Sequence, residues 1–259
     1  MRKMLSLVAA AIIVALGFGN VSYAADEKPE NTFEVAASSK WVSQYVGDAG
    51  AVFYEGAVLH NELTVTHSSG LYLDVWGSNS FKKPAINGSY GNEFDLTLGR
   101  AWEMYGLNFD AGVAYFDLAG RSIFSGSLEG DIIQPFLQVN GEVTVSESNK
   151  LFPSIKFEYA LPAIGNDPGL SGLHVHFALK HNAELSSTFS VSQKLTATYD
   201  DGAYGFDRAL IGAYEIAPTV KLSEKLSLNG SILVIGPLTS VNDGRKAEVV
   251  GSIGISTTF

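Results

Sequence analysis

The chain has 259 residues, a formal net charge of −10 and no cysteine. The lack of cysteine excludes a disulfide framework, a cysteine-ligated metal site and a thiol nucleophile, and the acidic excess argues against binding nucleic acid through its phosphates. Charged residues make up only 17% of the chain and aromatic residues 11%. That is a thin charged surface for a soluble protein, but it is expected of a barrel whose outer wall faces lipid.

The N-terminus predicts export from the cytoplasm. Arg2 and Lys3 precede an apolar run from Met4 to Phe18, and Ser22-Tyr23-Ala24 offers a small-x-small cleavage pattern. The run is short for a membrane anchor, so we interpret residues 1–24 as a signal peptide and residues 25–31 as a short periplasmic tail. Loss of Arg2 and Lys3 with the signal peptide lowers the formal net charge from −10 to −12.

From Thr32 the sequence alternates with a period of two residues. In the first such segment Phe33, Val35 and Trp41 fall on one face, and Glu34 and Lys40 fall on the other. Similar segments follow at about residues 57–66, 71–76, 93–102, 107–115, 131–144, 154–159, 173–180, 189–199, 208–222, 226–235 and 249–259. Such alternation indicates strands that bury one face. Pro135 cannot donate to a strand ladder, so we expect a bulge there.

The last segment has the features of a strand that closes an outer-membrane barrel. Val249, Ile253, Ile255 and Phe259 share one face, and the chain ends on the aromatic residue. In bacterial outer-membrane barrels a C-terminal aromatic residue is the mark that the barrel assembly machinery reads, so Phe259, Ile255 and Ile253 are the predicted membrane insertion signal. On this segment alone, the final strand of a soluble β-sandwich is an equal alternative.

The connections between the segments alternate between long and short. About twelve strands with short turns at one end and longer loops at the other are typical of outer-membrane barrels, whose short turns lie in the periplasm. We therefore predict that residues 32–259 form an all-β, transmembrane, antiparallel up-and-down barrel in the bacterial outer membrane. Aromatic residues near strand ends suggest interfacial girdles, although strands are rich in aromatic residues generally. These residues are Trp41, Tyr45, Trp102, Tyr115, Tyr159, Tyr199 and Phe259.

Residues 39–120 resemble the TorF-type porins, a family of proteobacterial outer-membrane proteins. The resemblance is carried by short motifs at the first five predicted strands: Ser39-Lys40-Trp41-Val42, His67-Ser68-Ser69-Gly70-Leu71-Tyr72, Trp76-Gly77-Ser78, Glu93, Asp95-Leu96, Gly99, Gly106-Leu107, Asp110, Gly112 and Tyr115-Phe116. It implies a barrel regarded as a porin, without an established substrate.

The charged and histidine side chains on the inward faces are the candidate pore lining. They are Glu34, Lys40, His60, Glu62, Asp74, Asp95, Asp110, Lys156, Glu158, His174, His176, Lys180, Lys194, Glu215 and Lys221. Acidic residues gather on the second to fifth strands and lysines on the seventh to tenth, which predicts a transverse field that selects solutes by charge and size. The alternative is that these side chains pair with one another and plug a narrow barrel.

Neither a metal site nor catalysis is predicted. His174 and His176 share a strand face, but no third ligand can be located from the sequence, so polar lumen residues are the simpler interpretation. The outer-membrane phospholipase is a barrel of similar size, yet here no outward histidine neighbours an outward serine, and no Gly-x-Ser-x-Gly motif occurs. We expect no cofactor and no enzymatic activity.

The predicted function is passive diffusion of small hydrophilic solutes or ions across the outer membrane. The expected partners are outer-membrane lipid, the barrel assembly machinery and small polar solutes, with no nucleic acid. The alternatives are a plugged barrel with a structural or surface-recognition role, including use as a phage receptor, and a secreted soluble β-protein. The oligomeric state is left open.

Overall fold

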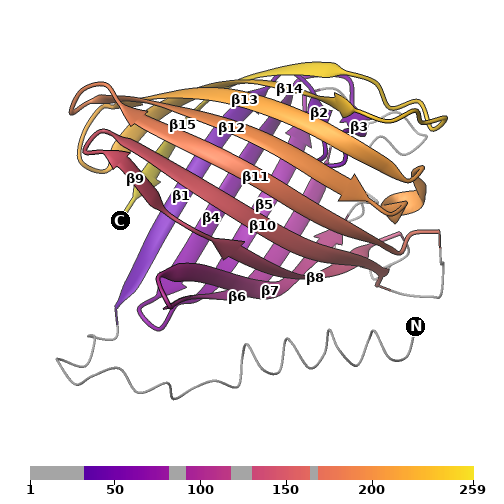
Figure 1. Ribbon diagram of the computed structural model, residues 1–259, viewed down its shortest axis with the longest axis horizontal. Coiled ribbons are helices and arrows are strands. Elements are labelled where there is room, and N and C mark those ends of the chain that lie inside the picture. Colours follow the sequence, from indigo (N-terminus) through magenta and orange to yellow (C-terminus); the bar gives the residue numbers. More distant parts are fainter. Residues whose placement is uncertain (1–31, 82–91, 118–129, 164–168) are drawn as a thin grey trace.

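The computed structural model describes residues 32–81, 92–117, 130–163 and 169–259 (Figure 1). The predicted signal peptide, residues 1–24, and the tail, residues 25–31, lie outside these ranges. None of the helices in the described part of the chain is long and apolar enough to cross a membrane.

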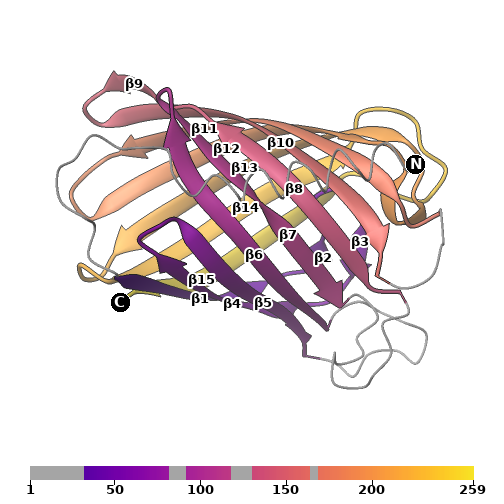
Figure 2. The same ribbon diagram turned by 90° about the horizontal axis from the view of Figure 1, so that it is seen from below.

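Within the described residues, twelve antiparallel strands close into a barrel (Figures 1 and 2). They are β1 (Phe33–Val42), β4 (Val58–His67), β5 (Leu71–Ser80), β6 (Glu93–Met104), β7 (Leu107–Asp117), β8 (Ile132–Asn140), β10 (Asn149–Pro162), β11 (Gly172–Glu184), β12 (Phe189–Asp200), β13 (Ala209–Lys221), β14 (Leu226–Pro237) and β15 (Glu248–Thr258). β9 (Val143–Ser146) continues the line of β8 beside β10. The predicted fold class is confirmed.

Closure is made by the first and last strands. β1 pairs with β15 from Ala36↔Thr258 to Val42↔Ser252, and Phe259 N–H donates to the Val35 carbonyl at 2.8 Å. A sheet closed in this way has no free edge, so its strand N–H and C=O groups are satisfied internally, which a hydrocarbon environment requires.

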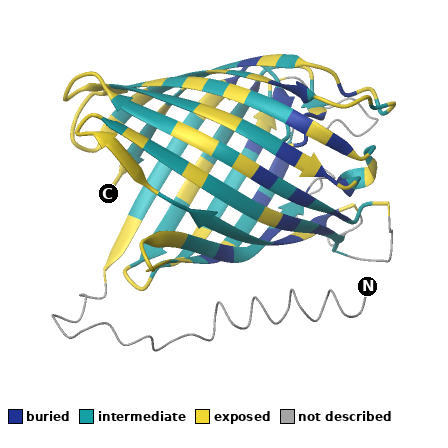
Figure 3. Cartoon of the chain, in the orientation of Figure 1, coloured by how far each residue is buried: buried dark blue, intermediate teal, exposed yellow. Residues whose placement is uncertain are grey.

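The outer wall is apolar. Large outward side chains stay exposed on strand after strand, among them Leu63, Leu73, Leu98, Phe177, Leu195, Ile232 and Ile253. Leu98 and Leu195 are 57% and 59% exposed, and the exposed residues recur along the outside of the strands (Figure 3). Since burying one such side chain contributes about 1.5–3 kcal/mol, this surface favours lipid over water.

The two ends of the barrel differ as the sequence predicts. Short connections join β4 to β5, β6 to β7, β11 to β12 and β13 to β14, and the C-terminus lies at the same end (Figure 1). The β6–β7 turn consists of Tyr105 and Gly106, with φ values of 54° and 74°. Positive φ at both central residues matches the twist of the flanking strands, and Gly106 adopts it without steric cost.

The prediction of a bulge at Pro135 is wrong. Pro135 pairs with Val113 of β7 in unbroken register. On its other side the ladder keeps one register from Glu158↔Phe136 to Leu161↔Ile133, but it has no pair at Pro135. The missing N–H is therefore accommodated by a gap in one ladder rather than by an extra residue.

The pairing of β1 with β15, the closing seam of the barrel, depends on Gly254. A Cβ at Gly254 would lie 2.5 Å from the Ser39 carbonyl oxygen, whereas a Cβ at Gly251 would meet no atom within 4 Å. We expect Gly254→Val to force β15 from β1 and to destabilise the barrel by about 1–3 kcal/mol, the usual cost of overpacking. Urea unfolding of the barrel in lipid vesicles, together with heat-modifiable gel mobility, measures the loss.

Gly251→Val is the matched control on the same strand, and it should leave both measurements unchanged. Equal losses in the two variants would contradict the role of Gly254 at the seam.

Candidate functional site in the barrel lumen

A cavity of about 590 Å³ occupies the lumen. Its lining comes from every barrel strand except β12 and includes ten of the predicted pore residues: Lys40, His60, Glu62, Asp74, Asp95, Asp110, Lys156, Glu158, His174 and Glu215. The alternation brings these residues together because each strand turns the same face inward.

Five predicted pore residues lie outside the cavity lining: Glu34, His176, Lys180, Lys194 and Lys221. His176 is buried against Glu158 and Thr198. Lys180 and Lys194 are direct cross-strand partners, and Lys194 also faces Glu215 on β13. Glu34 and Lys221 lie near the short-turn ends of β1 and β13.

The connection between β1 and β4 folds into the lumen. It forms a small hairpin of β2 (Tyr45–Val46) and β3 (Val52–Tyr54), which both views place within the outline of the barrel (Figures 1 and 2). Val46 packs near Ile211 and Ile235, on the side of β13 and β14. Residues 43–57, the inserted loop, therefore reach across the bore and narrow it.

Tyr45 anchors the inserted loop. Its ring centroid lies 5.1 Å from that of Phe53 and 5.1 Å from that of His60. Burial, reinforced by the nearby Glu93 charge, raises the pKa of the Tyr45 phenol well above its ordinary value. The phenol therefore stays protonated and donates to Glu93 Oε2 at 2.7 Å. The expectation that Tyr45 joins an interfacial girdle is wrong, because its ring is buried inside the barrel.

The two-residue alternation did not predict that residues 43–57 enter the lumen. The signal that it missed was the apolar content of the segment, since Val46, Phe53 and Tyr54 would be exposed in a loop outside the barrel.

Arg245 links three connections at the long-loop end of the barrel: β1–β4, β12–β13 and β14–β15. Its guanidinium donates to the Ala49 carbonyl of the inserted loop at 3.0 Å, to Asp200 Oδ2 at 2.6 Å and to Asp243 Oδ2 at 2.8 Å. It also donates to the Asp207 carbonyl and lies 5.0 Å from the centroid of the Phe206 ring. Although burial opposes it, hydrogen bonding from Arg245 holds the pKa of Asp243 below its ordinary value. The stability contributed by Asp243 is therefore present near neutral pH and is lost as the pH falls through that lowered pKa.

The cavity is strongly acidic. Its lining holds eight carboxyl groups, from Asp48, Glu62, Asp74, Glu93, Asp95, Asp110, Glu158 and Glu215, and two lysines, Lys40 and Lys156. Lys156 is ion-paired with Glu158 and lies 5.0 Å from the centroid of the Phe136 ring.

Two of the cavity carboxylates, Asp74 and Asp110, accept hydrogen bonds from hydroxyl groups. Thr64 donates to Asp74 Oδ1 at 2.6 Å, and Tyr72 donates to Asp110 Oδ1 at 2.9 Å. The Tyr72 ring covers Gly99, where a Cβ would lie 2.4 Å from its atoms. The ring therefore covers this part of the wall, and the hydrogen-bond partners of both carboxylates are neutral hydroxyl groups.

Glu158, His174 and His176 are the group of donors among the described residues that is able to hold a metal ion. One ligand atom from each lies within 4.8 Å of the other two, and all three side chains are buried.

Solved structures with this architecture are outer-membrane channels and related barrels. The porin KdgM, in complex with disordered oligogalacturonate, is similar over 87% of this chain and 99% of its own, with a TM-score of 0.53 and 6% identity. An outer-membrane channel from Pseudomonas putida F1 is similar over 91% of this chain and 100% of its own, with a TM-score of 0.50 and 12% identity. A bacterial polysaccharide outer membrane secretin is similar over 90% of this chain and 99% of its own, with a TM-score of 0.50 and 6% identity.

No protein-family model matches the chain, and no curated protein matches it. At such low identities the structural likeness establishes the fold and not a substrate. The chain has the fold of the outer-membrane β-barrels.

Arg245 offers a test of the inserted loop. Arg245→Met leaves the buried Asp200 carboxylate without its cation and removes the bond to Ala49. We expect a loss of about 3–5 kcal/mol, as for a broken buried ion pair. Urea unfolding measures this loss, and limited proteolysis should show new cleavage within residues 43–57.

Arg208→Met is the matched control, because Arg208 pairs with Asp201 at 2.6 Å on the exposed surface. Its loss should be about 0–1 kcal/mol, and the inserted loop should stay protected. Protection that persists in Arg245→Met would show that Arg245 does not hold the loop.

Proposed function

We propose that this protein is a porin-like channel that lets small hydrophilic solutes or ions diffuse passively across the outer membrane. The observation that carries the proposal is the cavity of about 590 Å³, lined by charged side chains and enclosed by a barrel whose outer wall is apolar. Water and polar solutes are stable in such a lumen, while lipid surrounds the wall. The proposed role is transport without catalysis.

The charge of the cavity supports a preference for cations. Eight carboxyl groups against two lysines give the lumen an excess of negative charge. Rings of acidic side chains attract cations and repel anions in channels, and low-dielectric walls strengthen this field. Asp74 and Asp110 are the residues that we propose carry the preference, because their partners are neutral hydroxyl groups.

The remaining sequence-based assignments belong to the same proposal. The ten predicted pore residues that line the cavity would line the diffusion path. Membership of the TorF-type porins fits the motifs that lie on β1, β4, β5, β6 and β7. Removal of residues 1–24 would precede insertion. Phe259, Ile255 and Ile253 form the insertion signal for the barrel assembly machinery, and all three side chains are exposed on the outer wall or at the terminus.

Planar-bilayer recording tests the channel directly. The purified protein should produce ion conductance, and the reversal potential in a KCl gradient should show K⁺ to be preferred over Cl⁻. The double variant Asp74→Asn/Asp110→Asn should reduce the permeability ratio on the order of threefold, because it removes two charges but keeps the acceptor oxygens.

Glu142→Gln is the control for loss of a carboxylate outside the cavity, because Glu142 pairs with Lys150 and does not line the cavity. It should leave the ratio unchanged. A wild-type protein without ion conductance would refute the channel. A wild-type protein that prefers Cl⁻ would refute the proposed selectivity.

A plugged barrel is the second candidate, and the inserted loop favours it. Tyr45 and Arg245 fix this loop across the bore, and Tyr204 reaches the same cavity from the β12–β13 connection. In such a barrel the loops at the long-loop end would serve recognition instead of transport.

Shortening the inserted loop separates the two candidates. Replacing residues 46–54 by a short Gly-Ser linker should raise the single-channel conductance about twofold or more if the native loop only narrows an open pore. If the protein is plugged, the native form is silent and the shortened form alone conducts. Equal conductance in the two forms would show that the loop does not limit the bore.

A further inference from the structure

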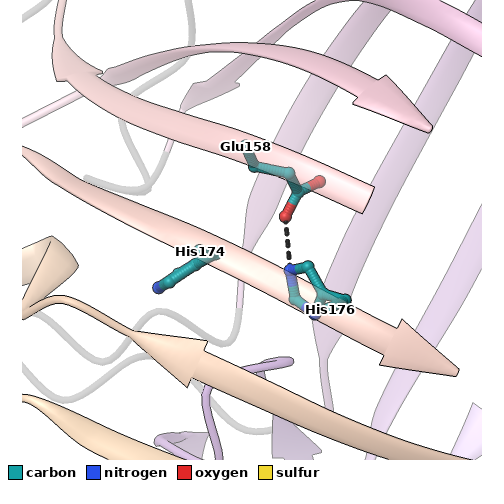
Figure 4. A group of neighbouring side chains, drawn as sticks. All are labelled: Glu158, His174 and His176. Carbon is teal, nitrogen blue, oxygen red and sulfur yellow. Dashed lines mark hydrogen bonds and ion pairs between the residues drawn. The ribbon is translucent and has the colours of Figure 1, made fainter. Parts of the chain in front are cut away.

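The strongest unassigned cluster in the lumen wall lies where three neighbouring strands meet. Glu158 on β10 faces His174 on β11, which in turn faces Asp200 on β12. The adjacent row consists of Lys156, His176 and Thr198 on the same three strands. These two rows place both histidines beside Glu158, as Figure 4 shows.

We propose that Glu158, His174 and His176 bind one divalent transition-metal ion of the zinc class. Two imidazoles and one carboxylate supply three protein ligands, and a water molecule or a solute group would occupy the fourth position. Hard cations such as Ca²⁺ and Mg²⁺ prefer oxygen ligands alone, so two imidazoles disfavour them.

The distance between two of the three donor atoms is already close to that of a metal site. His176 Nε2 and Glu158 Oε2 are 2.8 Å apart. Ligand bonds of about 2.0–2.1 Å in a tetrahedral site require about 3.3 Å between donor atoms. The His176 ring therefore has to withdraw by about half an ångström for an ion to replace the hydrogen bond.

Each histidine already has a partner that would orient it toward a metal. His176 Nδ1 lies 2.9 Å from Thr198 Oγ1, so an Nε2-bound metal leaves Nδ1–H free to donate to this hydroxyl. His174 Nε2 lies 3.3 Å from Asp200 Oδ1 without a hydrogen bond in the present geometry, and a metal bound at Nδ1 would let Nε2–H donate to this carboxylate. Hydrogen bonds of this kind from ligating imidazoles to oxygen atoms are the usual support of metal sites.

The cluster is reachable from the lumen. Glu158 and His174 line the cavity, so an ion and its water ligand have a path to the site. Lys156 pairs with Glu158 through Oε1, and this pairing leaves Oε2 for the metal. Burial of the three side chains protects the site from competition by bulk water.

Metal titration of the untagged barrel, isolated from the outer membrane in detergent, tests the site without reference to conductance. Zn²⁺ should bind at one ion per barrel, and Co²⁺ should give the visible absorption of a four-coordinate site that Zn²⁺ abolishes. His174→Ala and His176→Ala should each weaken Zn²⁺ binding by about 100-fold or more, and Thr198→Val by about tenfold. Glu158→Gln should also weaken binding while preserving the side-chain volume.

His181→Ala is the matched control. His181 lies on the same strand but bonds to Asn149 instead of the cluster, so Zn²⁺ binding should be retained. Heat-modifiable gel mobility identifies which variants are folded. Absence of saturable binding by the wild-type protein, or equal binding by folded His174→Ala, His176→Ala and Glu158→Gln variants, would overturn the proposal.

Discussion

The backbone ladder between β1 and β15 is the constraint on which the rest of the structure depends. In hydrocarbon an unpaired N–H or C=O group costs several kcal/mol, so a transmembrane sheet has to close. Once the ring closes, every strand has one face toward lipid and one toward the lumen. The apolar exterior, the charged interior and the sorting of connections to two ends all follow from that geometry.

Closure alone does not determine what fills the bore, and a second set of interactions decides it. The inserted loop is held by apolar packing around Tyr45 and by the buried Arg245, which contacts carboxylates and carbonyls from three connections. This arrangement explains why Val42 and Val250 face inward: they pack against Tyr45 rather than against water. The outer part of the lumen is thus partly a hydrophobic core.

The charges of the lumen are arranged by cross-strand register. Asp74 and Asp110 accept hydrogen bonds from the neutral hydroxyl groups of Thr64 and Tyr72, whereas Glu158 is paired with Lys156 and His176. The same register that leaves one wall acidic gathers imidazoles and carboxylates on the other wall. The proposed solute selection and the proposed metal site therefore rest on different residues of the lumen.

The sequence by itself determined the strands, the inward and outward faces and the ends at which the connections lie, because a period of two residues and the length of a connection are local properties. Only the tertiary structure decided that residues 43–57 enter the bore, that Arg245 meets Asp200 and Ala49, that Glu158 joins His174 and His176, and that Pro135 needs no bulge. Each of these outcomes depends on register between strands or on contacts between residues distant in the chain, neither of which a local pattern specifies.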